Sequence, residues 1–265
     1  MLLSEKLKST CTSKIGLCVG LDPVIDRVPE KFHNSKEPFY EFCKTVVEST
    51  SDVASAYKPN LAFFEALGAD GWIQLQKTIR AIPKEKLVIA DAKRGDIGNT
   101  AKAYSKALFE GLNADMTTVS PYLGRDSLQP FIDNPEHGIF ALAVTSNPGG
   151  ADLQTLMIDG EPLFIHVIKM VRSINTDANV GIVVGATKSD ILPMVLEAAI
   201  DLPLLIPGVG SQGGDVDALR NALEGYDAPV FVNSSRGIIY ASAGKDFETA
   251  VHDAAVRQFS ELNNV

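Results

Sequence analysis

The chain has 265 residues, of which 45% are hydrophobic and 22% charged, and its formal charge at pH 7 is −9. This composition is typical of a soluble globular protein that is large enough to bury a full core. The acidic balance argues against a nucleic-acid-binding surface, and the longest apolar runs are far shorter than the roughly 20 residues that a membrane span needs.

The first segment, MLLSEKLKST, has leucines at helical spacing among charged residues. This pattern predicts a short amphipathic helix rather than a signal peptide. Cys11, Cys18 and Cys43 are odd in number and form no CxxC pair, which is typical of reduced cysteines in a cytoplasmic protein. The four histidines are scattered without ligand spacing, so we expect no metal site.

Short, apolar, β-branched runs recur along the chain and resemble strands buried in a parallel sheet. The expected strands are Ile15–Leu21, Val53–Tyr57, Leu87–Ala90, Ala114–Val119, Ile139–Val144, Val180–Val184, Pro203–Ile206 and Val230–Val232. Segments with a helical period alternate with them: Phe39–Ser51, Gly71–Ala81, Thr100–Leu112, Pro162–Ile174, Ser189–Ile200 and Phe247–Leu262. Eight such units in about 250 residues predict an α/β fold, the (β/α)8 TIM barrel. No linker divides the chain, so we expect a single domain over residues 1–265.

One motif favours a different topology, an open doubly wound sheet. Gly208-Val-Gly210-Ser-Gln-Gly213 fits the G-x-G-x-x-G fingerprint of dinucleotide-binding proteins. However, it follows the seventh expected strand instead of the first, and the acid at the expected distance, Asp227, precedes the next strand instead of ending it. A phosphate-binding loop is the better interpretation, because barrels commonly bind phosphate after strands seven and eight.

Polar residues collect where the expected strands end, and in a barrel all these ends face one side. They are Asp22, Lys58, Asn60, Asp91, Lys93, Thr145, Ser146, Asn147, Ser211, Gln212, Ser234, Ser235 and Arg236. An isolated Asp or Ser among them is better explained as a capping or turn residue. The charged ones all fall at the same end of the strands, which indicates an active site.

The stretch ADAKRGDIGNT after the third strand carries most of the expected chemistry. Because side chains at i and i+2 share a face of a strand, we expect Asp91 and Lys93 to point into one cavity, with Lys58 on the neighbouring strand. A lysine between carboxylates keeps its proton and acts as a proton donor and fixed positive charge. A salt-bridge network that only plugs the barrel end would not explain the phosphate-binding loops at the same end.

The same stretch predicts a turn and a second helix. Gly95 is expected to turn the chain, and a helix that starts near Asp96 would place Asp96 and Thr100 on one face. That face would lie at the barrel rim, where a charged residue can reach a neighbouring subunit. Alternatively, Asp96 merely caps its own helix.

At this point the motifs resemble a known family. DAKRGDIGNTAKAY (Asp91–Tyr104) closely resembles the signature of the orotidine 5′-phosphate decarboxylase family. The likeness extends to GLCVGLDP, AYKPNLAFFEALG, SPYLGRD, TSNPGG, PGVGSQGGD and NSSRGI, and is greatest to the bacterial branch with longer chains. The resemblance implies a cofactor-free barrel that acts as a homodimer and converts orotidine 5′-monophosphate to UMP in pyrimidine biosynthesis.

Position by position, the resemblance also implies site residues. The catalytic array would be Asp91, Lys93 and Asp96, with Lys93 as proton donor and Lys58 beside it. The implied substrate-binding residues are Asp22 and Lys58 for the ribose, Ser146 for the pyrimidine, and Gln212, Arg236 and the backbone of Gly237 for the phosphate. Asp96 and Thr100 would act in the site of the partner subunit.

Two other functions fit parts of the sequence. Another phosphosugar lyase or decarboxylase of the same barrel superfamily would reuse a D-x-K-x-x-D strand end with Mg²⁺ and an enediolate, and it would lose activity in EDTA. A phosphate-ligand-binding barrel would bind UMP without turnover. The Arg94-Gly95 pair, the run through Asn99-Thr100 and the TSNPGG motif resemble the orotidylate branch specifically, and the Asp–Lys–Asp array disfavours a non-enzymatic barrel.

Overall fold

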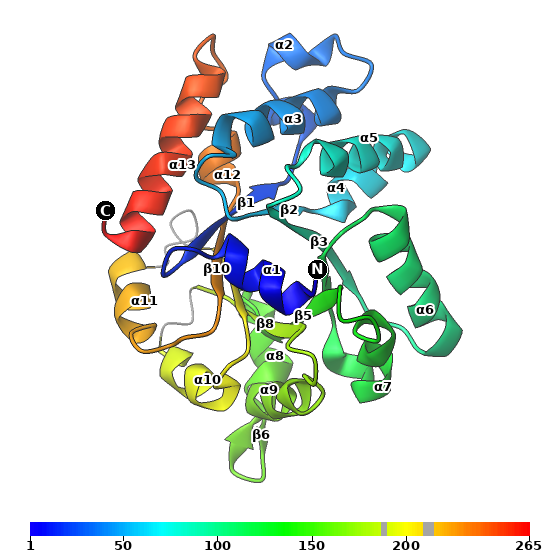
Figure 1. Ribbon diagram of the computed structural model, residues 1–265, viewed down its shortest axis with the longest axis vertical. Coiled ribbons are helices and arrows are strands. Elements are labelled where there is room, and N and C mark those ends of the chain that lie inside the picture. Colours follow the sequence, from blue (N-terminus) through cyan, green and yellow to red (C-terminus); the bar gives the residue numbers. More distant parts are fainter. Residues whose placement is uncertain (187–189, 209–214) are drawn as a thin grey trace.

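The structure is a computed structural model of the chain and describes residues 1–186, 190–208 and 215–265. Eight parallel strands close into a barrel in the order β1-β10-β9-β8-β5-β4-β3-β2, and helices surround it (Figure 1). The barrel strands are β1 (Gly16–Leu21), β2 (Ala56–Pro59), β3 (Leu87–Arg94), β4 (Met116–Val119), β5 (Gly138–Val144), β8 (Val180–Val184), β9 (Leu204–Pro207) and β10 (Val230–Ser234). The predicted (β/α)8 barrel is therefore confirmed.

Two strands differ from the prediction in ways that matter for the cavity at their ends. β2 begins at Ala56, because Val53 lies in a turn after the preceding helix. β3 continues to Arg94 instead of ending at Ala90. The longer β3 keeps Asp91 within the sheet, where an isolated bridge joins it to Asn60 at the end of β2.

Helices alternate with the strands and form the outer layer of the barrel. They are α1 (Leu3–Thr10), α2 (Glu30–His33), α3 (Pro38–Thr50), α4 (Leu61–Glu65), α5 (Gly68–Ala81), α6 (Gly98–Lys106), α7 (Arg125–Leu128), α8 (Ala151–Gln154), α9 (Leu163–Ser173), α10 (Leu192–Ala199), α11 (Val216–Ala222), α12 (Arg236–Ile239) and α13 (Phe247–Asn263). No helix in the three described ranges is long and apolar enough to cross a membrane.

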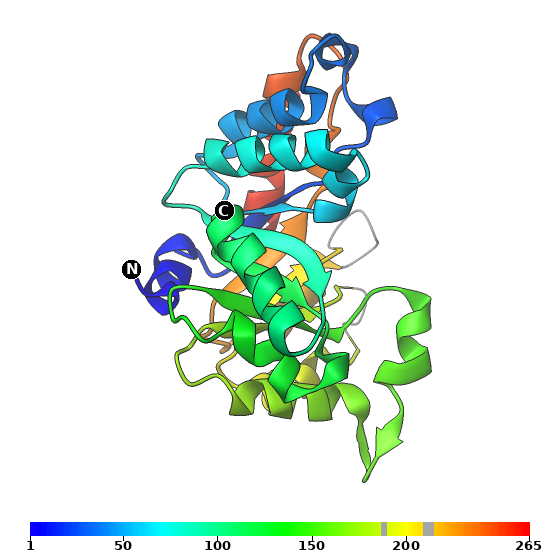
Figure 2. The ribbon, with the colours of Figure 1, turned by 90° about the vertical axis from the view of Figure 1, so that its right-hand side faces the viewer.

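The helices follow the apolar period of the sequence, but several elements differ from the prediction. The helix predicted over Thr100–Leu112 starts earlier, as α6, and continues beyond Lys106 as a π-helical turn over Ala107–Gly111. α10 begins at Leu192, and the predicted start, Ser189, lies outside the described residues. A small antiparallel hairpin of β6 (Met157–Ile158) and β7 (Glu161–Pro162) projects from the barrel (Figure 2), and it turns at Asp159-Gly160, a hairpin signal that the prediction did not include.

The N-terminal helix closes one end of the barrel. Leu3 and Leu7 of α1 are 1% exposed and pack against inward-facing side chains of the strands, such as Ile89 of β3. Lys6 fixes the helix with a 2.7 Å ion pair to Asp115, next to β4. Figure 1 shows α1 across the middle of the barrel, and Figure 2 shows it at the left side of the molecule. The other end of the barrel therefore remains for a site.

Every second side chain of a strand faces the inside of the barrel, and these inward-facing side chains change from apolar to polar toward that other end. Inward-facing Leu87 and Ile89 on β3 are followed by Asp91, and Phe231 on β10 is followed by Asn233. The same step leads from Ala56 to Lys58 on β2 and from Met116 to Thr118 on β4. Successive layers of inward side chains fill such barrels, and here the last layer is polar and ionised.

Candidate active site

A cavity of about 310 Å³ opens at the C-terminal ends of the strands. It gathers residues from segments that are far apart along the chain. Its lining residues are Asp22, Val24, Arg27, Lys58, Asn60, Phe63, Asp91, Pro207, Gly208, Asn233, Ser235, Arg236 and Tyr240. The structure thus brings together four of the residues that the resemblance implies: Asp22, Lys58, Asp91 and Arg236.

The wall of this cavity includes a carboxylate that lies between two lysines; Asp91 and Lys58 line the cavity, and Lys93 is not among its lining residues. Lys58 Nζ lies 2.7 Å from Asp91 Oδ2, and Lys93 Nζ lies 2.6 Å from Asp91 Oδ1. The Lys58 and Asp91 side chains are 6% and 8% exposed, whereas that of Lys93 is 52% exposed. Asp91 therefore fixes one buried lysine and holds a second one that is open to an incoming ligand.

The charges in this cluster stabilise one another against burial. Burial raises the pKa of Asp91, but the attraction of Lys58 and Lys93 outweighs it and holds that pKa well below its usual range. Burial lowers the pKa of Lys58, but the negative charges of Asp91 and then Asp22 outweigh it and raise that pKa above its usual value. Asp91 and Lys58 are thus both ionised at neutral pH.

Lys93 meets Asp91, as predicted, but for a reason other than strand alternation. Its φ is 47°, in the left-handed region that side-chain-bearing residues rarely adopt. The pairing of β3 with β4 also shifts register between Ala90 and Arg94. The i, i+2 argument does not hold through this irregularity, and the left-handed turn is what brings Nζ back to the carboxylate.

The turn after β3 differs from the prediction at Gly95. Left-handed φ values occur on either side of this turn, at Lys93 near the end of β3 and at Gly98 (54°), the first residue of α6, and Gly95 is not among the positive-φ residues of the described chain. Gly95 instead lies close to the neighbouring strand, since an added Cβ would be 3.3 Å from the carbonyl oxygen of Ser120. A larger residue at this position would therefore need a small shift of the neighbouring backbone.

Asp96 and Thr100 do not share a helical face, because α6 begins at Gly98, after Asp96. The N-cap residue is Ile97, whose own N–H donates to Asp96 Oδ1 at 2.8 Å. A capping side chain accepts a hydrogen bond from the N–H of the second or third residue of its helix. Asp96 accepts from the N–H of Ile97 instead and therefore does not act as the N-cap of α6. Neither Asp96 nor Thr100 lines the cavity of its own barrel.

Two polar atoms in the cavity wall have no partner within the described chain. Asp22 Oδ1 and Ser235 Oγ are buried without a hydrogen bond, and both residues line the cavity. A buried polar atom without a partner costs about 1–3 kcal/mol. Both atoms are suited to bind hydroxyl groups or another polar part of a ligand.

Ser146, after β5, is half-buried, and its neighbour Thr145 forms hydrogen bonds with another side chain. Gln154 accepts from the Thr145 N–H at 2.9 Å and donates to its Oγ1 at 2.8 Å. An added Cβ at Gly185 would come within 2.7 Å of the Ser146 nitrogen, so the end of β8 packs directly on this segment. Thr145 is therefore engaged by Gln154, and Ser146 is not among the residues that line the cavity.

The residues implied for phosphate binding are described only in part. Arg236 begins α12 and lines the cavity with an exposed side chain. Gly237 follows in the first turn of α12, where helical N–H groups lack intrahelical acceptors. Gly208, with φ 97°, also lines the cavity. Gln212 and the neighbouring Ser211 lie outside the described residues.

Several cavity residues were not indicated by the sequence reasoning. The Tyr240 hydroxyl accepts from the Val24 N–H at 2.8 Å and donates to the Asp22 carbonyl at 3.0 Å, and the Arg27 guanidinium lies 4.2 Å from the Tyr240 ring centre. These contacts join residues that are more than 200 positions apart in the sequence, so no local sequence pattern indicates them. Asn233 had a signal, the inward period of β10 after Phe231.

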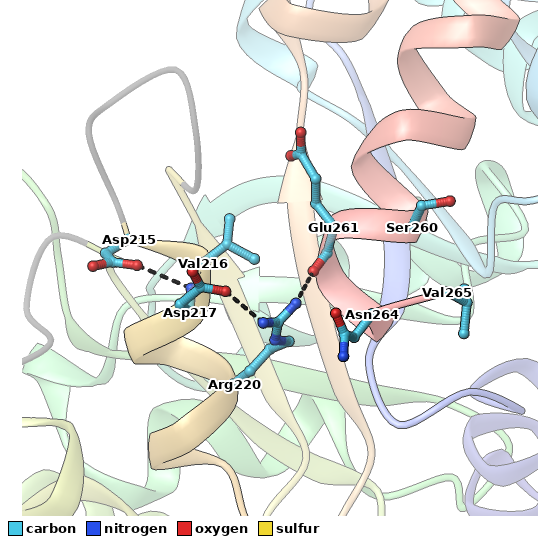
Figure 3. A pocket seen from close by; sticks show the side chains of 8 residues that line it. All are labelled: Asp215, Val216, Asp217, Arg220, Ser260, Glu261, Asn264 and Val265. Atoms are coloured by element: carbon cyan, nitrogen blue, oxygen red, sulfur yellow. Dashed lines mark hydrogen bonds and ion pairs between the residues drawn. The ribbon is translucent and has the colours of Figure 1, made fainter.

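Another hollow, between α11 and α13 near the C-terminus, has no comparable chemistry (Figure 3). Its guanidinium, on Arg220, is already bound to Asp217 and, at 2.7 Å, to the Glu261 carbonyl. Asp215 there caps α11. Within the described ranges no group of three or more His, Cys, Asp or Glu side chains could hold a metal ion.

A (β/α)8 barrel with an ionised cavity at the C-terminal ends of its strands has the architecture of a barrel enzyme. Residues 16–249 match the family described as Orotidine 5′-phosphate decarboxylase / HUMPS. The chain belongs to this family.

Individual relatives carry the name of one branch. Orotidine 5′-phosphate decarboxylase of Herpetosiphon aurantiacus is 45% identical over 257 residues, which cover 96% of this chain and 95% of the relative. That of Roseiflexus castenholzii is 46% identical over 94% of this chain and 92% of the relative. The solved Leishmania donovani OMP decarboxylase is 36% identical, with a TM-score of 0.83 and full coverage of both chains.

We predict that Asp91→Asn lowers the free energy of unfolding by about 3–5 kcal/mol at pH 7, because buried Lys58 loses its counter-charge. The pKa of Asp91 is lower in the folded than in the unfolded chain. Its contribution is therefore complete above the unfolded value of about 3.9 and is lost as the pH falls below it. Urea unfolding should show a constant gap to wild type from pH 7 to 5 and a smaller gap below pH 4.

The matched control is Asp217→Asn, which breaks an ion pair whose aspartate is 76% exposed. It should cost less than about 1 kcal/mol. Equal losses in the two variants would contradict the structural role of Asp91.

Proposed function

We propose that the chain decarboxylates orotidine 5′-monophosphate to UMP and CO2, the last step of de novo UMP biosynthesis, in the cavity at the strand ends. The observation that carries the proposal is the Lys58–Asp91–Lys93 array in a chain of this family. Loss of orotidylate absorbance on addition of purified protein, without added metal or cofactor, is the direct test. A protein that binds UMP but leaves the absorbance unchanged would contradict it.

The array suits the electronic demand of this reaction. Loss of CO2 from C6 leaves a carbanion in the ring plane, which the π-system of the pyrimidine cannot delocalise. A cofactor-free enzyme has no electron sink of the usual kind, so preorganised charge must stabilise the carbanion. In our proposal Lys93 supplies this charge and then protonates C6, while Asp91, itself fixed by Lys58, holds Lys93 in place.

The remaining groups would bind the rest of the nucleotide. We assign Asp22 and Lys58 to the ribose hydroxyls, Ser146 to the pyrimidine, and Gln212, Arg236 and the Gly237 backbone to the phosphate. Asp22 Oδ1, which has no hydrogen-bond partner within the described residues, supports the first assignment, and the position of Ser146 directly after β5 supports the second. Because the phosphate is remote from C6, its binding energy can be used to press the pyrimidine against Lys93.

The rival reaction, a Mg²⁺-dependent enediolate lyase of a phosphosugar, differs in its metal requirement. The family description includes a second branch, but the relatives named above are all called decarboxylases. EDTA separates the two: the rival would lose activity, and the proposed decarboxylase would keep it.

We further propose that two copies of the chain share each active site, with Asp96 and Thr100 acting in the partner's cavity. Both residues lie outside their own cavity, at the start of α6. The surrounding surface is apolar: Ile97, Tyr122 and Leu123 are 58%, 81% and 46% exposed, and α6 contacts α7, which follows the Tyr122 segment. Exposed apolar patches of this kind commonly mark interfaces.

A cytoplasmic location also belongs to the proposal. Cys11, Cys18 and Cys43 are free thiols, as expected where thiols stay reduced. Burial raises the pKa of Cys18 to about 12, which makes this thiol inert although it lies near the charged cluster.

We expect Lys93→Ala to abolish nearly all decarboxylation while the fold is kept, because its exposed side chain has little packing to lose. Loss of a proton donor alone costs about 10²–10⁴ in rate, and loss of the positive charge adds to this. The measurement is kcat with orotidylate, alongside an unfolding curve. Lys84→Ala, an exposed lysine far from the cavity, should behave as wild type. Activity of Lys93→Ala within tenfold of wild type would reject this role.

Arg236→Ala should weaken UMP binding by about 1.5–3 kcal/mol, because a charge-assisted hydrogen bond to the phosphate is lost. Titration calorimetry with UMP and with uridine, which lacks the phosphate, measures the effect. The loss should be confined to UMP. An equal loss for both ligands would mean that Arg236 does not bind the phosphate.

The shared site predicts complementation between two inactive variants. Lys93→Ala and Asp96→Ala are each expected to be inactive. When they are mixed under conditions that allow subunit exchange, each hybrid dimer would contain one intact site and one doubly damaged site. Orotidylate turnover should then reappear.

Native mass spectrometry of the mixture provides the control, because it shows whether hybrid dimers have formed. Hybrids without activity would mean that each barrel uses its own Asp96, and the shared site would be rejected. A protein that stays monomeric at assay concentration yet is active would reject it as well.

A further inference from the structure

Thr118 is a buried hydroxyl on β4 that contacts two members of the charged array at once. It is 2% exposed and follows Met116 in the inward period of the strand. Its Oγ1 donates to Asp91 Oδ1 at 2.8 Å. The same atom accepts from the backbone N–H of Lys93 at 2.9 Å. A third strand of the barrel therefore takes part in the array.

The direction of these two bonds follows from their chemistry. A threonine hydroxyl has one proton and accepts through its lone pairs. Because Oγ1 accepts from the Lys93 N–H, its own proton is directed to Asp91, which is ionised and can only accept. Asp91 Oδ1 also accepts from Lys93 Nζ at 2.6 Å. The result is a closed ring: Lys93 N–H to Thr118, Thr118 to Asp91, and Lys93 Nζ to Asp91.

This ring forms where the backbone needs support. Lys93 has φ 47°, and the β3–β4 ladder shifts register between Ala90 and Arg94, so its N–H falls at the irregularity instead of in the regular ladder. A strained backbone conformation persists only when several contacts from the surrounding structure hold it in place. The Thr118 hydroxyl gives this N–H an acceptor and thereby ties the strained backbone to the carboxylate that holds the same lysine's ammonium.

We propose that Thr118 is a positioning residue for the decarboxylation. It holds Asp91 Oδ1 and the Lys93 backbone in one fixed arrangement, so that Lys93 Nζ is aimed at the reacting carbon. Thr118 itself does not line the cavity. The inference rests on the proposed function, since it assigns Thr118 a role only if Lys93 is the proton donor.

The neighbouring Thr117 provides a matched control. It is also a fully buried threonine of β4, but its Oγ1 donates to the backbone carbonyl of Ala90 at 2.9 Å and contacts no side chain of the array. Removal of the Thr117 hydroxyl costs the fold a buried hydrogen bond to a backbone carbonyl, and removal of the Thr118 hydroxyl costs it the bonds to Asp91 and to the Lys93 N–H. Only removal of the Thr118 hydroxyl should disturb Lys93.

The test compares Thr118→Val, Thr118→Ser and Thr117→Val in steady-state decarboxylation and in UMP binding. Thr118→Val keeps the shape but not the hydroxyl, and we expect kcat to fall about 10- to 100-fold, as for a lost hydrogen bond to a charged group. UMP affinity should stay within about twofold, because the nucleotide contacts are untouched. Thr118→Ser should restore kcat, and Thr117→Val should keep the wild-type value.

A structural role alone would give a different result. It would lower kcat alike in Thr118→Val and Thr117→Val, or leave Thr118→Val as active as wild type, and either outcome overturns the inference. If Thr118→Val does not fold, the comparison of Thr118→Ser with Thr118→Ala decides: equal activities of these two would also overturn it. Wild-type protein without decarboxylase activity would refute the proposed function instead, irrespective of these variants.

Discussion

The site depends on one interaction, the sharing of the Asp91 carboxylate between Lys58 and Lys93. A buried carboxylate is stable only when it is paired and hydrogen-bonded, and Asp91 has a lysine on each oxygen. This demand fixes the geometry of neighbouring strands, because β2 must bring Lys58 beside the end of β3. The bridge between Asn60 and Asp91 meets the demand by continuing the pairing of these strands into the polar layer.

The two ends of the barrel have different roles: the end at α1 is apolar and contributes to stability, and the opposite end carries the charged cavity. At one end α1 buries Leu3 and Leu7 against an apolar lumen, and burial there needs no partner. At the other end the same inward positions hold charged and hydroxyl groups that require partners. Both layers consist of inward-facing side chains of the same strands. The packed apolar layer therefore keeps these strands rigid and holds the ionised side chains in place.

Contacts between distant parts of the chain hold the ligand-binding groups together. The Tyr240 hydroxyl binds the backbone at both Asp22 and Val24, so the segment after β10 holds the segment after β1. Arg27 rests on the same aromatic ring. Groups assigned to the phosphate and to the ribose are thereby linked, which lets the binding of one part of the nucleotide support the placement of the other.

The sequence by itself determined the barrel and the identity of the central charges, because strand period and the motif around Asp91 are local patterns. It also indicated that Lys58 lies nearby, from the order of the strands. Only the tertiary structure decided that Lys93 is left-handed, that Asp96 precedes α6, and that Thr118 closes a ring with both array residues. The conformation of Lys93 and the contacts of Thr118 depend on the register between β3 and β4, which arises from barrel closure and side-chain packing and leaves no periodic pattern in the sequence.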